Sequence, residues 1–195
     1  MTAEATKVQI VEAADRLFYE RGYEHTSFAD IAAEVQISRG NFYYHFRTKD
    51  EILDAVIRRR LETTQAMLDG WEAEGAGPVE RITSFIQILI VNQTKIMAFG
   101  CPVGTLTSEL AKLGHPSQAG ATGLFSLFRH WLARQFGLMG RDGGEADQLA
   151  LHLLARSQGV ATLASALRDK AFVEAEVQDM CAWLSAQVPA PTHLQ

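Results

Sequence analysis

The 195-residue sequence predicts an all-α fold, and three observations support that prediction. Apolar residues recur every three or four positions over most of the chain, which is the spacing of one face of an α-helix. No stretch shows the apolar–polar alternation of a half-buried strand, and no segment is repeated. The composition, 47% hydrophobic and 21% charged, is that of a globular chain rather than of a disordered one.

Three helices followed by a long one are expected in the first part of the chain, at about residues 10–21, 28–35, 38–45 and 48–71. Gly22 ends the first, because glycine accepts the positive φ at which many helices close. Polar N-cap residues precede the other three, namely Thr26 or Ser27, Ser38 and Thr48. Thr48 and Glu51 also have the spacing of a capping box.

Further helices are expected at residues 79–99, 103–113, 124–136, 145–167 and 172–188, after a break at Gly75–Pro78 and with a loop over 137–144. The first of these is apolar around much of its circumference, as a core helix is. The expected organisation is a small domain over residues 1–48, a larger helical domain over 49–188 and a Pro-rich tail over 189–195.

The chain has no apolar run near the ~20 residues that span a bilayer, and its polar start does not resemble a signal peptide. We therefore expect a cytoplasmic protein with no membrane partner. Cys101 and Cys181 lack the spacing of a zinc site or a disulfide framework, and His115, His130 and His152 lack metal-ligand spacing, so neither a metal nor another cofactor is expected.

Charge is distributed unevenly along this acidic chain, whose net charge is −5. The segment 36–60 carries six basic residues and three acidic ones, so a basic patch lies on an acidic body. Such a patch is suited to nucleic-acid phosphates. A solvated helix face is an equally good interpretation of the charges alone.

The content of the third expected helix favours nucleic acid. The run Ser38–Lys49 holds several aromatic residues among hydrogen-bond donors and cations. Ile10 to Leu53 resembles the DNA-binding domain of the TetR family of bacterial regulators in three motifs: Ala14–Tyr23, Thr26–Ala32 and Gly40–Lys49. The resemblance implies an all-α fold of about nine helices, with a helix-turn-helix DNA-binding domain over 1–48 and a ligand-binding and dimerisation domain over 49–188.

The resemblance also implies DNA-binding roles, position by position. Tyr43 and Lys49 match phosphate-binding positions, and Thr26 and Ser27 would add phosphate contacts at the start of the second helix. Gly40 would allow a close approach of the backbone to DNA, and Ser38 is a further DNA-binding candidate. Positions that match groove-facing ones are Arg39, Asn41, Tyr44 and His45. The interior of this small domain is expected to contain Phe18, Ile31, Phe42 and Phe46.

One departure from the family pattern lies in the turn, where Val35-Gln36 replaces the usual Ala-Gly. Glycine accepts positive φ at little cost, whereas Gln36 would be strained by about 1 kcal/mol or would force a different turn. The fold is expected to survive the change.

The C-terminal half is expected to hold a mostly apolar pocket for a small, aromatic or largely apolar effector. Its candidate residues are Trp71, Phe85, Asn92, Phe99, Cys101, Thr105, Phe125, Phe128, Trp131 and Gln158. A packed core with satisfied polar groups is the alternative for each of them. The run Phe99–Gly104 resembles a Gly-Cys-Pro run from one branch of the family, and a redox role for Cys101 is a minor alternative.

The last two helices carry small or apolar stripes that, by the resemblance, pair with a second copy. The twofold axis would place two recognition helices about 34–36 Å apart, in successive major grooves of a palindromic operator. The hypothesis is a homodimeric repressor that a small effector releases from its operator through a shift of the helix over 48–71. The alternatives are a DNA-binding structural or division-control protein of the same fold without effector, and an all-α enzyme. Enzymatic activity is not expected, because no nucleophile–base pair or phosphate loop is visible.

Overall fold

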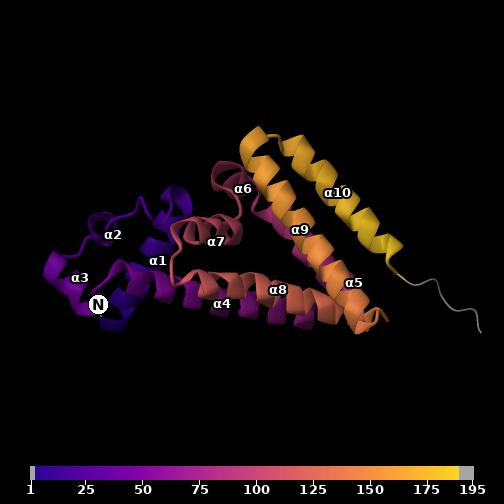
Figure 1. Ribbon diagram of the computed structural model, residues 1–195, viewed down its shortest axis with the longest axis horizontal. Helices are drawn as coiled ribbons and strands as arrows, with labels where there is room; N and C mark the ends of the chain where they lie inside the picture. Colours follow the sequence, from indigo (N-terminus) through magenta and orange to yellow (C-terminus); the bar gives the residue numbers. More distant parts are fainter. Residues whose placement is uncertain (1–2, 189–195) are drawn as a thin grey trace, which may run out of the picture. The chain divides into compact units, whose positions relative to one another are not determined.

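The computed structural model describes residues 3–188, and of Arg39 the backbone alone. Within that part the chain forms ten helices and no strand (Figure 1). They are α1 (Ala3–Arg21), α2 (Phe28–Val35), α3 (Arg39–His45), α4 (Lys49–Glu74), α5 (Pro78–Val91), α6 (Gln93–Phe99), α7 (Pro102–Leu113), α8 (Gln118–Leu138), α9 (Gly143–Leu167) and α10 (Lys170–Ala186). The all-α prediction is confirmed. The expected tail at 189–195 lies outside the described residues.

The described chain divides into two compact units, each of which combines segments that are distant in sequence. Unit 1 comprises residues up to Thr64 together with Pro102–Phe125. Unit 2 comprises Gln65–Cys101 and the residues from Ser126 onwards. Both α4 and α8 contribute to each unit, and the expected boundary at residue 48 stays a prediction.

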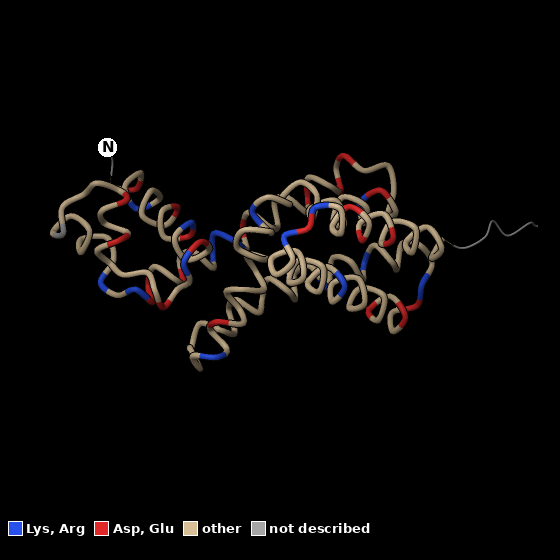
Figure 2. The backbone as a smooth tube through the Cα atoms, turned by 90° about the horizontal axis from the view of Figure 1, so that it is seen from above, with Lys and Arg blue, Asp and Glu red and all other residues tan. Residues whose placement is uncertain are grey.

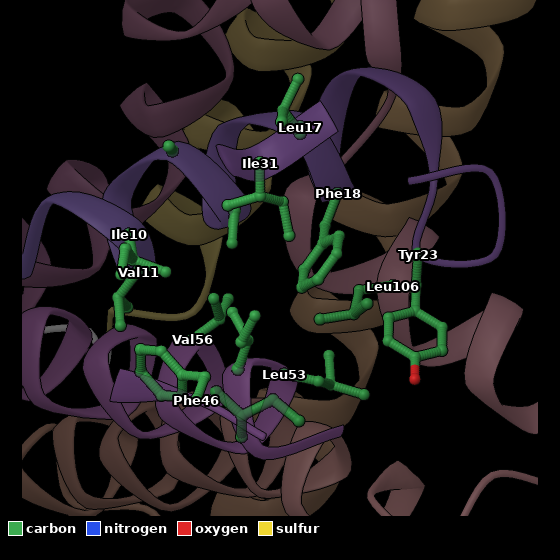
Figure 3. Packing of buried hydrophobic residues seen from close by; sticks show 14 of the residues in the cluster. Ile10, Val11, Leu17, Phe18, Tyr23, Ile31, Phe46, Leu53, Val56 and Leu106 are labelled. Atoms are coloured by element: carbon green, nitrogen blue, oxygen red, sulfur yellow. The ribbon is translucent and has the colours of Figure 1, made fainter. Parts of the chain in front are cut away.

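A single apolar core joins the elements of unit 1. Figure 3 shows side chains from α1, α2, α4 and α7 converging on one another, among them Phe18, Ile31, Leu53 and Leu106. The four residues expected inside this domain, including Phe42 and Phe46, are all buried, which confirms that prediction. Since burying one large apolar side chain stabilises a fold by about 1.5–3 kcal/mol, α7 contributes to the stability of this unit through Leu106 and Leu110.

Unit 2 packs α5 against α10 and α6 against α9. Its core pairs the apolar face of α5, with Ile82 and Ile86, and that of α10, with Val177 and Met180. Edge-to-face packing of Phe85 on Phe128 adds an aromatic contact, with ring centroids 5.5 Å apart.

Three expected helices have clearly different bounds from those predicted. Helix α1 begins at Ala3, before the predicted residue 10. The segment 79–99 is two helices rather than one, because Asn92 leaves helical geometry (φ −102°, ψ 12°) and its side-chain amide donates to the carbonyl of Ile88. Helix α8 begins at Gln118, before the predicted residue 124. Its first turns contain Gly120 and Gly123, which lie close to α4. The sequence of these turns therefore has no apolar stripe.

Among residues 3–188, no single helix is both long and apolar enough to cross a membrane, although the bent pair Pro78–Val91 and Gln93–Leu113 passes that test when taken together. The same residues hold no group of three or more His, Cys, Asp or Glu side chains arranged to bind a metal ion.

Candidate nucleic-acid interface

The connection between α2 and α3 is a tight turn with defined caps at both sides. Ser27 caps α2 in a reciprocal capping box with Asp30, and the side chain of Ser38 accepts a hydrogen bond from the amide of Asn41 at 3.3 Å. Gln36 closes α2 in the left-handed conformation (φ 57°, ψ 39°). Of the two outcomes expected for Gln36, the chain shows the first: it keeps the turn that glycine would favour and bears the strain at Gln36.

Helix α3 has one buried and one exposed face. Phe42 is 1% exposed and packs edge-to-face on Phe28 of α2, with ring centroids 5.1 Å apart. On the other face, Tyr43 is 52% exposed and stacks on Phe28, while Tyr44 is 77% exposed. Polar aromatic rings are thus held outward by a helix whose inner residues fix its rotation.

The remaining predicted positions on α3 lie with these tyrosines. Asn41 and Ser38 are exposed, and His45 is half-buried with its ring edge-on to Tyr44. A Cβ placed on Gly40 would meet no atom within 4 Å, so the surface there is open. The side chain of Arg39 lies outside the described part of the structure.

Thr26 and Ser27 are arranged differently from the expectation that they contact phosphate. Thr26 is fully buried and its hydroxyl donates to the carbonyl of Gly22 at 2.7 Å, so its side chain has no route to a DNA strand. The amide and hydroxyl of Ser27 both donate to a carboxylate oxygen of Asp30, at 2.8 and 2.5 Å. These bonds hold the pKa of Asp30 below its usual value, so an anion already occupies the donors of Ser27.

Lys49 is engaged within the protein. Its Nζ donates to the carbonyl oxygen of Tyr23 at 2.9 Å and to that of Glu24 at 3.4 Å, and it lies 4.1 Å from the centroid of the Tyr23 ring. Since an ammonium group has three protons, these bonds leave one for a further acceptor.

Sequence reasoning missed the importance of Tyr23 and Glu109 in this region. Tyr23 is 5% exposed, and its hydroxyl donates to Asp50 at 2.5 Å. The side chain of Glu109, from α7, accepts the backbone amides of Tyr23 and Glu24 at 2.9 Å each. Contacts across 86 residues leave no local pattern, so no sequence signal pointed to Glu109.

Basic and acidic residues are interspersed along the backbone of the described chain (Figure 2). Two of the six basic residues of the segment 36–60 pair with acidic residues of unit 1. Arg59 pairs with Glu12, and Arg60 pairs with Asp15. The phosphate-attracting charge of this segment is therefore smaller than its sequence count indicates.

The candidate effector residues are divided between the units: Thr105 and Phe125 belong to unit 1 and the other eight to unit 2. In unit 2, Trp71 and Trp131 have ring centroids 5.6 Å apart. Phe85 and Phe128 are buried, Cys101, Phe125 and Gln158 are half-buried, and Asn92, Phe99 and Thr105 are exposed.

Two further features concern buried polar groups in unit 2. Trp131 is 3% exposed, and within residues 3–188 its Nε1 is one of two buried side-chain polar atoms without a hydrogen-bond partner. Burial raises the pKa of the Cys181 thiol, which disfavours the reactive thiolate.

A capped recognition helix that follows a tight turn, carried by an all-α chain, defines a helix-turn-helix protein. The family model described as bacterial regulatory proteins, tetR family, matches residues 10–56. Over these residues the chain matches the DNA-binding domain of the TetR family.

Individual relatives agree with this assignment. The chain is 32% identical over 123 residues to an uncharacterized HTH-type transcriptional regulator in the lacX 3′ region of Lactococcus lactis subsp. lactis, covering 62% of this chain and 63% of the relative. It is 27% identical over 133 residues to the HTH-type transcriptional repressor DhaR of Mycobacterium sp. (strain GP1), covering 68% and 64%. The aligned part thus spans less than two thirds of either relative.

Among solved structures, a TetR-family transcriptional regulator from Agrobacterium tumefaciens matches with a TM-score of 0.82 at 21% identity, over 93% of this chain and 98% of that one. At this identity the likeness shows a shared fold.

Proposed function

We propose that the protein is a homodimeric transcription regulator that binds a palindromic DNA operator in the cytoplasm and is released from it by a small effector. The observation that carries the proposal is the exposed face of α3, where Tyr44 is 77% exposed beside Asn41 and Tyr43. A soluble helix exposes such rings at a cost, which contact with a groove would remove.

In this proposal α3 enters the major groove. Arg39, Asn41, Tyr44 and His45 read base edges, since Arg pairs with guanine, Asn with adenine, and a ring lies against a thymine methyl group. Gly40 allows a close approach of the backbone, because nothing lies within 4 Å of a Cβ built there. Phosphate contacts come from Tyr43, Ser38 and the remaining proton of Lys49.

The dimer would form through α9 and α10. Helix α9 carries three exposed leucines, Leu151, Leu163 and Leu167, which are 42%, 47% and 59% exposed. Burial of these side chains against a second copy favours association. Because such a dimer has a twofold axis, each subunit would read one half of a palindromic operator.

Effector binding is proposed for the aromatic residues of unit 2. Trp71, Phe85, Phe128 and Trp131 supply apolar surface, and an effector that carries a hydrogen-bond acceptor would satisfy the free indole nitrogen of Trp131. Repression is proposed because the relative DhaR is a transcriptional repressor. Release requires the effector to bind the DNA-incompetent form more tightly.

A mobility-shift experiment tests the DNA-binding part of this proposal. Full-length protein is titrated onto DNA from upstream of its own gene and onto a scrambled duplex, across a salt series. Tyr44→Ala is expected to weaken specific binding by about ten- to hundredfold, since one base contact contributes about 1–3 kcal/mol. Val91→Ala, which truncates an 80% exposed side chain in unit 2, is the control. Equal affinity for both duplexes, unaffected by Tyr44→Ala, would reject the proposal.

A further inference from the structure

The loop over residues 22–26, which connects α1 to α2, is held on both sides by opposite charges. The Glu109 carboxylate accepts the amides of Tyr23 and Glu24, one on each oxygen, at 2.9 Å. On the carbonyl side, Lys49 Nζ donates to the oxygens of the same two residues, at 2.9 and 3.4 Å. The backbone of two consecutive residues is thus fixed between an anion from α7 and a cation from α4.

The packing around these contacts leaves the 22–26 loop little room to move. Gly22 has a φ of +89°, and a Cβ built on it would come within 3.0 Å of a Glu109 carboxylate oxygen. Leu106, one turn before Glu109, lies beside Phe18 and Tyr23 in the core (Figure 3). Glycine is therefore needed at residue 22 both for its conformation and for the close approach of the carboxylate.

The loop ends where α2 begins. The Thr26 hydroxyl is bonded to Gly22 and its amide to the carbonyl of Tyr23, and Ser27 is the N-cap of α2. The inner face of α2 in turn supports α3, since Phe28 packs on both Phe42 and Tyr43. A displaced loop would therefore move the start of α2 and, through Phe28, the exposed face of α3.

We propose that Glu109 is a positioning residue for DNA binding: it contacts no DNA, but its carboxylate fixes the 22–26 loop and thereby the orientation of the α2–α3 pair. This inference rests on the proposed DNA-binding function. Simple electrostatics makes the opposite prediction, because removal of an acidic side chain should strengthen binding to phosphates. The two effects can be separated by their sign.

The test compares Glu109→Ala, Glu109→Gln and the control Glu62→Ala in the full-length protein. Glu62 is an exposed glutamate of unit 1 on α4, so the control removes the same charge. Affinity is measured for DNA that the wild type selects from a random pool, and exchange of the Tyr23 and Glu24 amides is followed by NMR.

Glu109→Ala is expected to lose the protection of both amides and to weaken specific binding about tenfold with an unchanged salt slope. Glu109→Gln, which keeps a single acceptor oxygen, should fall between it and the wild type. Glu62→Ala should bind as tightly as the wild type or more tightly.

Two results would overturn the inference: unchanged amide protection in Glu109→Ala, or an affinity for DNA equal to that of Glu62→Ala. If the wild type selects no sequence, the proposed function fails. The amides then decide separately whether Glu109 holds the loop, and persistent protection would reject that role.

Discussion

The two units differ in how they treat buried polar groups. In unit 1, the buried Arg60 is fully engaged: its Nε and Nη2 bind Asp15 and its Nη1 donates to the carbonyl of Pro102 at 2.6 Å. In unit 2, the described structure leaves the Nε atoms of Trp131 and Arg141 buried without partners. Satisfied networks fix one geometry, whereas an unpaired buried donor favours a unit that can gain a ligand. The comparison predicts a more rigid unit 1 and a more adaptable unit 2.

The largest effect is expected from a substitution in the core of unit 1. Phe42→Ala removes a ring that is 1% exposed and should destabilise the protein by about 3–5 kcal/mol. Urea unfolding followed by circular dichroism measures the loss. Tyr44→Ala, on the exposed face of the same helix, should change stability by less than about 0.5 kcal/mol. Equal losses for the two variants would mean that α3 is not oriented as described.

Arginine replacements test the comparison of the units directly. Arg60→Met leaves Asp15 and the Pro102 carbonyl without their donors and should cost about 2 kcal/mol. Arg141→Met should cost less, because that side chain is 25% exposed and one of its donors is already unpaired. Chemical denaturation of both variants provides the measurement. A larger loss for Arg141→Met would reverse the contrast between the units.

The features that sequence predicted are those with local causes. Ser27 and Ser38 as N-caps and Gln36 as a strained turn residue follow from hydrogen bonds and φ preferences within a few residues. The buried face of α3, with Phe42 and Phe46, follows from helical spacing.

Features set by tertiary packing were not predicted. The start of α8 depends on Gly120 and Gly123 meeting α4, so its first turns lack an apolar stripe. Likewise, the contacts of Lys49 and Glu109 with the 22–26 loop join residues that are far apart in sequence. A single sequence contains no local pattern for such contacts.

The Tyr23–Asp50 hydrogen bond makes the stability of unit 1 depend on pH. This bond is the main cause that lowers the pKa of Asp50, whereas burial and then the same bond raise the pKa of Tyr23. A lowered carboxyl pKa contributes stability above about pH 4 that is lost as the pH falls through the folded value. A raised phenol pKa contributes stability below about pH 10 that is lost as the pH rises.

Tyr23→Phe should remove the phenol contribution, reduce the Asp50 contribution and cost about 1 kcal/mol near neutral pH. Thermal unfolding between pH 3 and pH 11, with Tyr43→Phe as the matched control on an exposed ring, measures the difference. If the unfolding temperature of Tyr23→Phe depends on pH as that of the wild type does, the bond does not stabilise unit 1.

The smallest effect is expected at the two non-glycine residues with positive φ, one in each unit. Gln36 (φ 57°) closes α2 in unit 1 and Arg168 (φ 52°) closes α9 in unit 2. Glycine relieves the strain of this conformation but has more freedom to lose on folding, so each glycine variant should gain only about 0.5–1 kcal/mol. If the strain at Gln36 serves only to form the turn, Gln36→Gly and Arg168→Gly should be stabilised alike and bind DNA like the wild type. If Gln36 also sets the tilt of α3, only Gln36→Gly will alter DNA affinity, which a mobility shift at matched protein stability would detect.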